Sequence, residues 1–125
     1  MGADAFSTRS DARWLDGRLA IDPPAPGTPA APVIYGPYLR LPEGRYSVEL
    51  YVRIEEGQPK RFMSEALAYG HKIYQKREAP RDGGPVRLTF DYDEPDVPLE
   101  FRIFVEDFDE RVTLTFSDAT VLRVG

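Results

Sequence analysis

Aromatic and charged side chains that could together recognise a sugar recur along this sequence of 125 residues. An aromatic ring packs on the apolar C–H face of a pyranose, while charged or amide groups exchange hydrogen bonds with its hydroxyls. A small-ligand site combines both kinds of group in a partly apolar recess. The candidates for ligand contact are Tyr35, Tyr38, Arg40, Tyr51, Arg53, Tyr69, His71 and Tyr74, with Trp14 and Asp93 as further candidates. The chain has seven Tyr and seven Phe, enough to fill a core and to cover its edges. For each ring, packing in or beside the core therefore competes with ligand contact.

Carboxylates concentrated in short segments raise the possibility of calcium. Asp91, Asp93 and Asp96 lie within six residues, and calcium takes about six to eight oxygen ligands. The spacing lacks the glycine and the final glutamate of an EF-hand loop. The competing interpretation is a solvated turn that discourages pairing of strand edges, as in the second acidic segment, residues 106–110. We expect no metal and no cofactor, and keep the three aspartates as the calcium candidates.

Residue types that would support catalysis are scarce. The chain has no Cys and one His, which excludes disulfides, thiol nucleophiles, Cys-ligated zinc and multi-His metal sites. His71 has no nearby Ser–Gly elbow, so we interpret it as a hairpin-turn residue. A glycosidase needs two paired carboxylates, but most acids here fall in turns with no cleft to perturb them. The sequence therefore predicts a protein that is not an enzyme, with no catalytic residue.

The charge balance limits the classes of partner. Sixteen Lys and Arg stand against 21 Asp and Glu, giving a formal charge of −5. This argues against nucleic acid and anionic membrane surfaces, which need a basic face. No run approaches the roughly 18 apolar residues of a membrane helix, so no membrane insertion is expected. Asp4, Arg9 and Asp11 interrupt any signal peptide. We expect synthesis in the cytoplasm and leave open whether the protein travels with an exported or particle-borne assembly.

Strands must position the candidate residues, because apolar and polar residues alternate along most of the chain. In residues 45–54, Tyr46, Val48, Leu50, Val52 and Ile54 share one face, as in a half-buried strand. Tyr51 and Arg53 fall on the opposite face. Further strands are predicted at 86–90, 99–105, 112–116 and 121–124, after a first strand that contains Trp14 and ends at Asp22. Turn residues separate them at 42–44, 56–59, 82–85 and 107–110.

The segment from Arg61 to Glu78 supports two interpretations. Part of it has good helix propensity. Gly70 interrupts it, and the β-branched and aromatic residues after Gly70 favour strands. We favour two strands, Phe62–Ala68 and Lys72–Arg77, joined near Tyr69, over one helix.

Eight or nine short strands with regular turns indicate an all-β protein, an antiparallel β-sandwich. Residues 1–32 are interpreted as an extended N-terminal arm with a Pro-rich connector, since five of the twelve prolines lie in residues 22–32. Residues 33–125 are predicted to form the sandwich domain.

The phrase Tyr35-Gly36-Pro37-Tyr38-Leu39-Arg40-Leu41-Pro42-Glu43-Gly44-Arg45-Tyr46 resembles the opening of bacterial jelly-roll, carbohydrate-binding-like domains found beside glycosyltransferases and in polysaccharide-related proteins. Residues 99–103 and 115–124 resemble the late strands of that group, so the resemblance covers about residues 33–124. It implies a jelly-roll sandwich and a binding module.

Two functions follow as hypotheses. The first is a non-catalytic module that recognises cell-surface polysaccharide and serves adhesion. The alternative is a structural or decoration subunit of a larger assembly, such as the surface spike of a particle, anchored by the N-terminal arm. Pro-rich arms that reach across subunits build symmetric assemblies, so a homo-oligomer or larger protein assembly is the partner under the second hypothesis.

Overall fold

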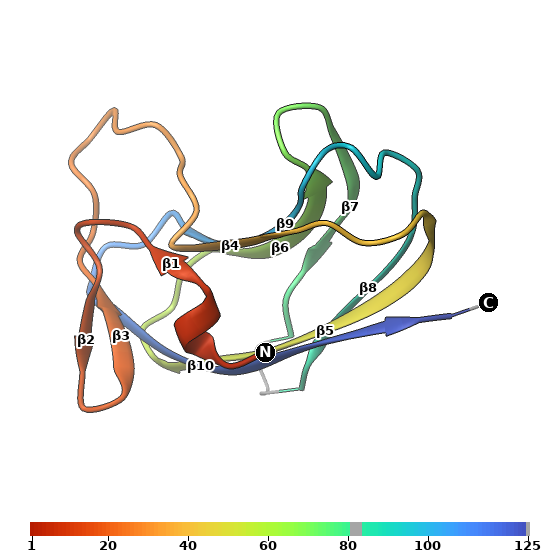
Figure 1. Cartoon of the computed structure of the whole chain (residues 1–125). Coiled ribbons are helices and arrows are strands. Elements are labelled where there is room, and N and C mark those ends of the chain that lie inside the picture. Colours follow the sequence, from red (N-terminus) through yellow and green to blue (C-terminus); the bar gives the residue numbers. More distant parts are fainter. Residues whose placement is uncertain (81–83, 125) are drawn as a thin grey trace.

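The computed structural model describes residues 1–80 and 84–124 and shows two five-stranded antiparallel sheets stacked on each other (Figure 1). Sheet I has the order β1-β4-β9-β6-β7, with β1 at Ser7–Thr8, β4 at Ile34–Leu39, β9 at Leu99–Glu106, β6 at Arg61–Ala68 and β7 at Lys72–Glu78. Sheet II has the order β2-β3-β10-β5-β8, with β2 at Arg13–Leu15, β3 at Arg18–Ile21, β10 at Val112–Arg123, β5 at Gly44–Glu56 and β8 at Val86–Tyr92. A 3₁₀ turn, η1, spans Ala3–Ala5. The predicted turn at 82–85 and the domain end at 125 fall partly outside the described residues.

The prediction of an all-β antiparallel sandwich is confirmed. The alternating face of β5 is buried as expected, with Val48 and Leu50 fully enclosed. Opposite them, β9 contributes the buried Leu99, Phe101 and Ile103. Burial of such side chains stabilises the fold by about 1.5–3 kcal/mol each, which makes the space between the sheets the main source of stability.

The interpretation of residues 61–78 as two strands is also confirmed. β6 and β7 pair in antiparallel register, from Met63 opposite Glu78 to Ala68 opposite Lys72. Gly70 adopts φ +73° in the turn between them, a left-handed conformation that breaks any helix. The His71 amide donates to the Ala68 carbonyl at 2.9 Å and closes this turn. The turn places Tyr69 at the end of sheet I.

Two predicted strand boundaries are wrong. The single first strand predicted to contain Trp14 and to end at Asp22 is a hairpin, β2 and β3, because Asp16 (φ 52°) and Gly17 (φ 78°) form a left-handed two-residue turn. The two last strands predicted at 112–116 and 121–124 are one strand, β10. A register irregularity between Phe116 and Asp118 lets β10 continue along β5.

The first 21 residues contribute to both sheets. β1 pairs with β4, Ser7 lying opposite Tyr35, while β3 lies between β2 and β10. Leu19 and Ile21 are 0% exposed. Residues 22–33 lie outside the strands and carry the chain from sheet II back to sheet I (Figure 1). The division into an arm of residues 1–32 and a domain of 33–125 stays a prediction about independent folding.

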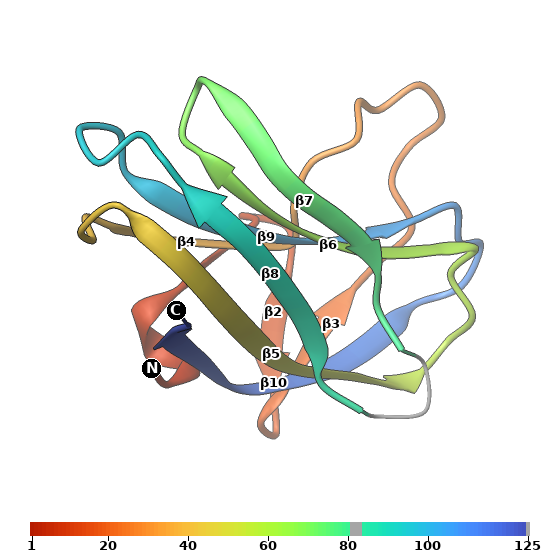
Figure 2. The ribbon, with the colours of Figure 1, turned by 90° about the vertical axis from the view of Figure 1, so that its right-hand side faces the viewer.

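One side of the sandwich lies where β7 of sheet I runs beside β8 of sheet II (Figure 2), and side chains link the two strands there. Gln75 accepts a hydrogen bond from the Thr89 amide at 2.7 Å, and Arg77 donates to the Arg87 carbonyl at 3.2 Å. The Tyr74 ring stacks on Phe90 with centroids 5.3 Å apart. Unpaired backbone groups on an edge strand invite association with other chains, so these contacts protect the edge of β8.

Gly57 lies in the turn between β5 and β6, and its substitution tests how closely this turn approaches the start of β10. Its φ is +97°, and a Cβ there would lie 2.8 Å from Val112 Cγ2 and 2.9 Å from the Arg111 carbonyl oxygen. Gly57→Ala should therefore lower the free energy of unfolding by about 3 kcal/mol, because the backbone is strained and the added methyl group is overpacked. Gly27→Ala is the matched control, because φ is +81° and nothing lies within 4 Å. In urea denaturation, Gly27→Ala should lower the free energy of unfolding by only about 1 kcal/mol. Equal losses would contradict the close approach of Gly57 to β10.

Candidate functional site

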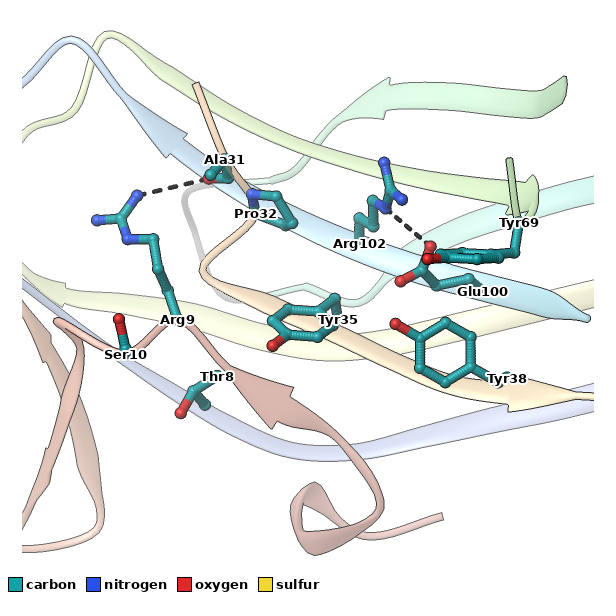
Figure 3. Close-up of a pocket in the computed structure, with 10 residues that line it drawn as sticks. All are labelled: Thr8, Arg9, Ser10, Ala31, Pro32, Tyr35, Tyr38, Tyr69, Glu100 and Arg102. Atoms are coloured by element: carbon teal, nitrogen blue, oxygen red, sulfur yellow. Dashed lines mark hydrogen bonds and ion pairs between the residues drawn. The ribbon is translucent and has the colours of Figure 1, made fainter. Parts of the chain in front are cut away.

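A hollow of about 520 Å³ lies on the outer face of sheet I, and we call it the tyrosine hollow (Figure 3). It is lined by Thr8, Arg9, Ser10, Ala31, Pro32, Tyr35, Tyr38, Tyr69, Glu100 and Arg102. These residues come from β1 and the chain after it, the end of the connector, β4, the β6–β7 turn and β9. Its volume lies within the usual range of small-ligand sites, roughly 300–1,000 Å³.

Strand alternation places polar residues on this outer face. In β4 and β9, Ile34, Phe101 and Ile103 point into the core, so Tyr35, Glu100 and Arg102 point the other way. Tyr35 pairs across the strands with Arg102, which in turn pairs with Glu65 of β6. Neighbours in such a register hold their side chains about 5 Å apart at Cβ. The register therefore makes a continuous polar row across sheet I.

Tyr38 and Tyr69 form one end of the hollow. Tyr38 has φ +68°, an uncommon conformation for a residue with a side chain, and the β4–β9 pairing shifts there between Gly36 and Leu39. The Tyr69 amide donates to the Pro98 carbonyl at 2.9 Å, which fixes the turn against the chain leading into β9. The two rings meet edge to face, with centroids 5.3 Å apart and planes at 90°. They form an aromatic corner open to solvent.

Two buried carboxylates share one arginine beneath this corner. Glu100 is 1% exposed and Glu65 3% exposed. Arg102 Nε donates to Glu100 Oε1 at 2.9 Å, and Arg102 Nη1 lies 3.7 Å from Glu65 Oε1. A buried charge needs such a partner, because desolvation otherwise costs several kcal/mol. Arg102 therefore holds both carboxylates in place.

Burial and charge perturb two groups here. Burial raises the pKa of the Glu65 carboxyl, against the opposing effect of Lys76 and Arg102. Partial burial, together with its interaction with the Glu100 carboxylate, raises the pKa of the Tyr38 hydroxyl, which thus stays protonated and able to donate. The hollow therefore combines phenol and guanidinium donors with a carboxyl group and exposed ring faces.

Three of the eight candidate residues from the sequence are gathered here: Tyr35, Tyr38 and Tyr69. His71 lies in the same turn as Tyr69, with Nδ1 3.3 Å from Glu94 Oε2. It lines a separate recess, to which Arg102 also contributes.

The remaining four candidates lie outside the hollow. Arg40 donates to the Asp96 carbonyl at 2.8 Å. Tyr51 and Arg53 are exposed on β5 in sheet II; Tyr51 donates to Glu49 at 2.6 Å, and Arg53 lies 3.7 Å from Glu55. Tyr74 packs between the sheets, and burial, with the nearby Asp93 carboxylate, raises its pKa to about 12. Its ring is therefore part of the packing that closes the sandwich.

Two of the three calcium candidates, Asp91 and Asp93, pair with cations. Asp91 accepts from Arg45 at 3.3 Å, and Asp93 accepts from Lys72 at 2.8 Å and from the Tyr74 hydroxyl at 3.1 Å. In residues 1–80 and 84–124, no three His, Cys, Asp or Glu side chains gather as metal ligands. Calcium binding stays a prediction without a gathered ligand set.

Sequence reasoning missed Glu100, Arg102 and Glu65. The alternation along residues 99–105 puts Glu100 and Arg102 on an outward face, which was available from the sequence. The burial of Glu100 and Glu65 was not, because it depends on segments that lie far from them in the sequence.

Compared with protein families, curated proteins and solved structures, this chain matches none. Within the part of the chain that the structure describes, no helix has the length and apolar character needed to cross a membrane. What the tyrosine hollow can bind therefore follows from its own residues.

Proposed function

We propose that the protein is a non-catalytic carbohydrate-binding module that takes cell-surface polysaccharide into the tyrosine hollow. The observation that carries the proposal is the convergence of Tyr35, Tyr38 and Tyr69 with the Glu100–Arg102 pair. Ring faces and a fixed donor–acceptor pair are the two kinds of group that a pyranose needs, one for its C–H face and one for its hydroxyls.

The proposed binding is weak and polyvalent. The hollow is open to solvent, so much of a bound sugar stays hydrated, and affinity for a single chain end falls in the roughly millimolar range. The Arg102 and Glu100 side chains are already held by each other, so little side-chain entropy is lost on binding. An adhesive role follows when several copies meet a repeating polymer, because linked sites gain avidity.

The strand order supports the finer assignment of the sandwich as a jelly roll. In this proposal the eight strands are β3-β10-β5-β8 in one sheet, opposite β4-β9-β6-β7 in the other. Double-sheet jelly rolls contain eight strands arranged as two Greek keys, and lectin domains are among them. The extended hairpin strand β2 and the short β1 then add one strand to each sheet.

Substitution of the hollow's rings tests the proposed function. A glycan array first identifies glycans that bind the full chain. Each is then titrated into the protein, and shifts of amide resonances in NMR spectra give its affinity. Tyr38→Ala and Tyr69→Ala should then each weaken binding about tenfold, since an aromatic contact of this kind contributes about 0.5–1.5 kcal/mol beyond the area that it buries. Tyr51→Ala is the matched control, because Tyr51 is an exposed tyrosine on sheet II. Absence of glycan binding at millimolar concentration, or an equal loss in Tyr51→Ala, contradicts the proposal.

A second function, a structural subunit of a larger assembly, is favoured by the edge hairpin. Trp14 and Leu15 are 45% and 46% exposed on β2, the outermost strand of sheet II. Exposed apolar residues on an edge strand are suited to pairing with another copy. Light scattering should then give an oligomer for the full chain and a monomer for a Trp14→Ser/Leu15→Ser variant. A monomeric full chain at high concentration contradicts this function.

A further inference from the structure

The recess that His71 lines lies on the same face of sheet I as the tyrosine hollow. It measures about 350 Å³ and is lined by Leu67, Gly70, His71, Lys72, Ile73 and Arg102, and we call it the isoleucine recess. Arg102 lines the tyrosine hollow as well, so one side chain borders both spaces. From β9 it reaches toward β6, where its Nη1 lies 3.7 Å from Glu65 Oε1.

The strand register sets the isoleucine recess next to the hollow. Leu67 of β6 lies opposite Glu100 of β9, and Ile73 of β7 lies opposite Leu67. Directly opposed residues of neighbouring strands point to the same side of a sheet, with Cβ atoms about 4.5–5.5 Å apart. Tyr74, the neighbour of Ile73, stacks on Phe90 between the sheets, which leaves Ile73 on the outer face. The two spaces therefore follow one another across β4, β9, β6 and β7.

Ile73 gives the isoleucine recess an apolar contact surface. Its side chain is 55% exposed, whereas Leu67 beside it is buried. Of the eight large apolar side chains exposed in residues 1–80 and 84–124, three border these two adjoining spaces: Tyr38, Tyr69 and Ile73. Exposed apolar side chains that gather on one face mark a binding surface.

The turn beside the recess is fixed by contacts within the protein. Lys72 Nζ donates to Asp93 Oδ2 at 2.8 Å, and His71 Nδ1 lies 3.3 Å from Glu94 Oε2. Both contacts join the β6–β7 turn to the segment between β8 and β9. A surface that is formed before a ligand arrives loses little conformational entropy on binding. The isoleucine recess can therefore add to binding in the hollow.

The width of sheet I sets the length of ligand that these spaces accept. Three strand spacings separate β4 from β7. Neighbouring strands lie about 4.8 Å apart, so the surface spans about 14 Å, the length of about three linked pyranose units. A single sugar in the hollow leaves the isoleucine recess empty.

We propose that the tyrosine hollow and the isoleucine recess form one extended site, which binds a linear polysaccharide over about three consecutive sugar residues. This inference rests on the proposed function, because it gives the length of chain that the same site recognises. The first sugar ring packs on Tyr38 and Tyr69 in the hollow. The chain then passes over Arg102, whose side chain is partly exposed, and its last ring packs on Ile73.

A series of chain lengths tests the extended site. The glycan array carries glucose, N-acetylglucosamine, mannose and galactose as homopolymers of one to six residues, beside glycans of other composition. Each homopolymer series that binds is titrated into the full chain by NMR, and for any other binding glycan its fragments of one to six residues are used. Affinity should rise by about tenfold or more from one to three residues and by less than about twofold from four to six. A single sugar that binds as tightly as the trimer overturns the extended site.

Two exposed apolar residues locate the second contact. Ile73→Ser should weaken binding of the trimer about fivefold and leave binding of the monosaccharide within about twofold, since only the longer chain reaches β7. Leu122→Ser is the matched control, because Leu122 is 56% exposed on β10 in sheet II, and it should change neither affinity. Circular dichroism checks the folding of both variants. Unchanged trimer binding by folded Ile73→Ser, or an equal loss for the monosaccharide, overturns the contact assigned to Ile73.

The outcomes separate this inference from the proposed function. Glycan binding that is lost in Tyr69→Ala but depends neither on chain length nor on Ile73 overturns the extended site and leaves carbohydrate binding in the hollow standing. Absence of binding by every glycan of the array at millimolar concentration overturns the proposed function itself.

Discussion

Leu19→Ala lowers the free energy of unfolding by about 2–5 kcal/mol, the range for a leucine removed from a packed core. Leu19 is fully buried and lies on β3, opposite Trp14 in β2 and Leu114 in β10. The lost methyl groups leave a cavity between the sheets that rigid strands on both sides cannot close. We expect the loss in urea denaturation followed by circular dichroism, with Trp14 fluorescence reporting on the hairpin itself.

Leu15→Ala is the control for this prediction. Leu15 belongs to the same hairpin but is 46% exposed, so its truncation should cost less than about 0.5 kcal/mol. Equal and small losses in both variants would show that β3 does not pack in the core in solution. The prediction also bears on truncation. A chain that starts at Val33 lacks β1, β2 and β3, so it should lose stability by more than Leu19→Ala does.

Arg102→Met destabilises the protein by about 3 kcal/mol at neutral pH, because two buried carboxylates lose their shared partner. This value is the lower end of the range for breaking a buried ion pair, since the Arg102 side chain keeps 28% exposure and some solvent screening. Arg53→Met on β5 is the control. Arg53 is exposed and lies 3.7 Å from Glu55, so its loss should lower the free energy of unfolding by less than about 0.5 kcal/mol.

The pH dependence of Arg102→Met has a defined sign. Burial raises the pKa of Glu65 above its ordinary value of 4.5 in the unaltered protein. A carboxyl with a raised pKa stabilises the folded state below the unfolded pKa, and that stabilisation is lost as the pH rises through the folded pKa. Removal of Arg102 raises the Glu65 pKa further. The deficit relative to the unaltered protein should therefore be largest at pH 7 and should shrink as the pH falls toward about 4.5.

A second substitution checks the cause of this deficit. Glu65→Gln in the Arg102→Met background removes one uncompensated charge, so it should restore part of the lost stability at pH 7. A deficit that is independent of pH and unaffected by Glu65→Gln would mean that Arg102 stabilises the sheet through packing of its aliphatic stem, and not through charge.

Local patterns in the sequence determined the strands and the fold class. Alternation in residues 45–54 and 99–105 indicates the buried faces of β5 and β9, because a half-buried strand must repeat every two residues. The choice of two strands for residues 61–78 depended on Gly70, whose effect on the backbone is local. The hairpin at Asp16-Gly17 also had a local signal, but the short flanking strands gave little alternation to set their register.

The site depends on the tertiary structure. Tyr35, Tyr38 and Tyr69 could be named as candidates from residue type alone, as could Tyr51 and Tyr74, which lie elsewhere. Selection among them requires the order β1-β4-β9-β6, which brings residues about 30 positions or more apart in the chain side by side. Nothing in the sequence distinguishes Glu65 and Glu100 from the other acidic residues of the chain. Glu100 and Arg102 lie two residues apart on β9, so strand alternation already sets them on one face. Glu65 meets Arg102 only because the β6–β9 register places the two opposite each other, and that register is fixed by long-range strand pairing.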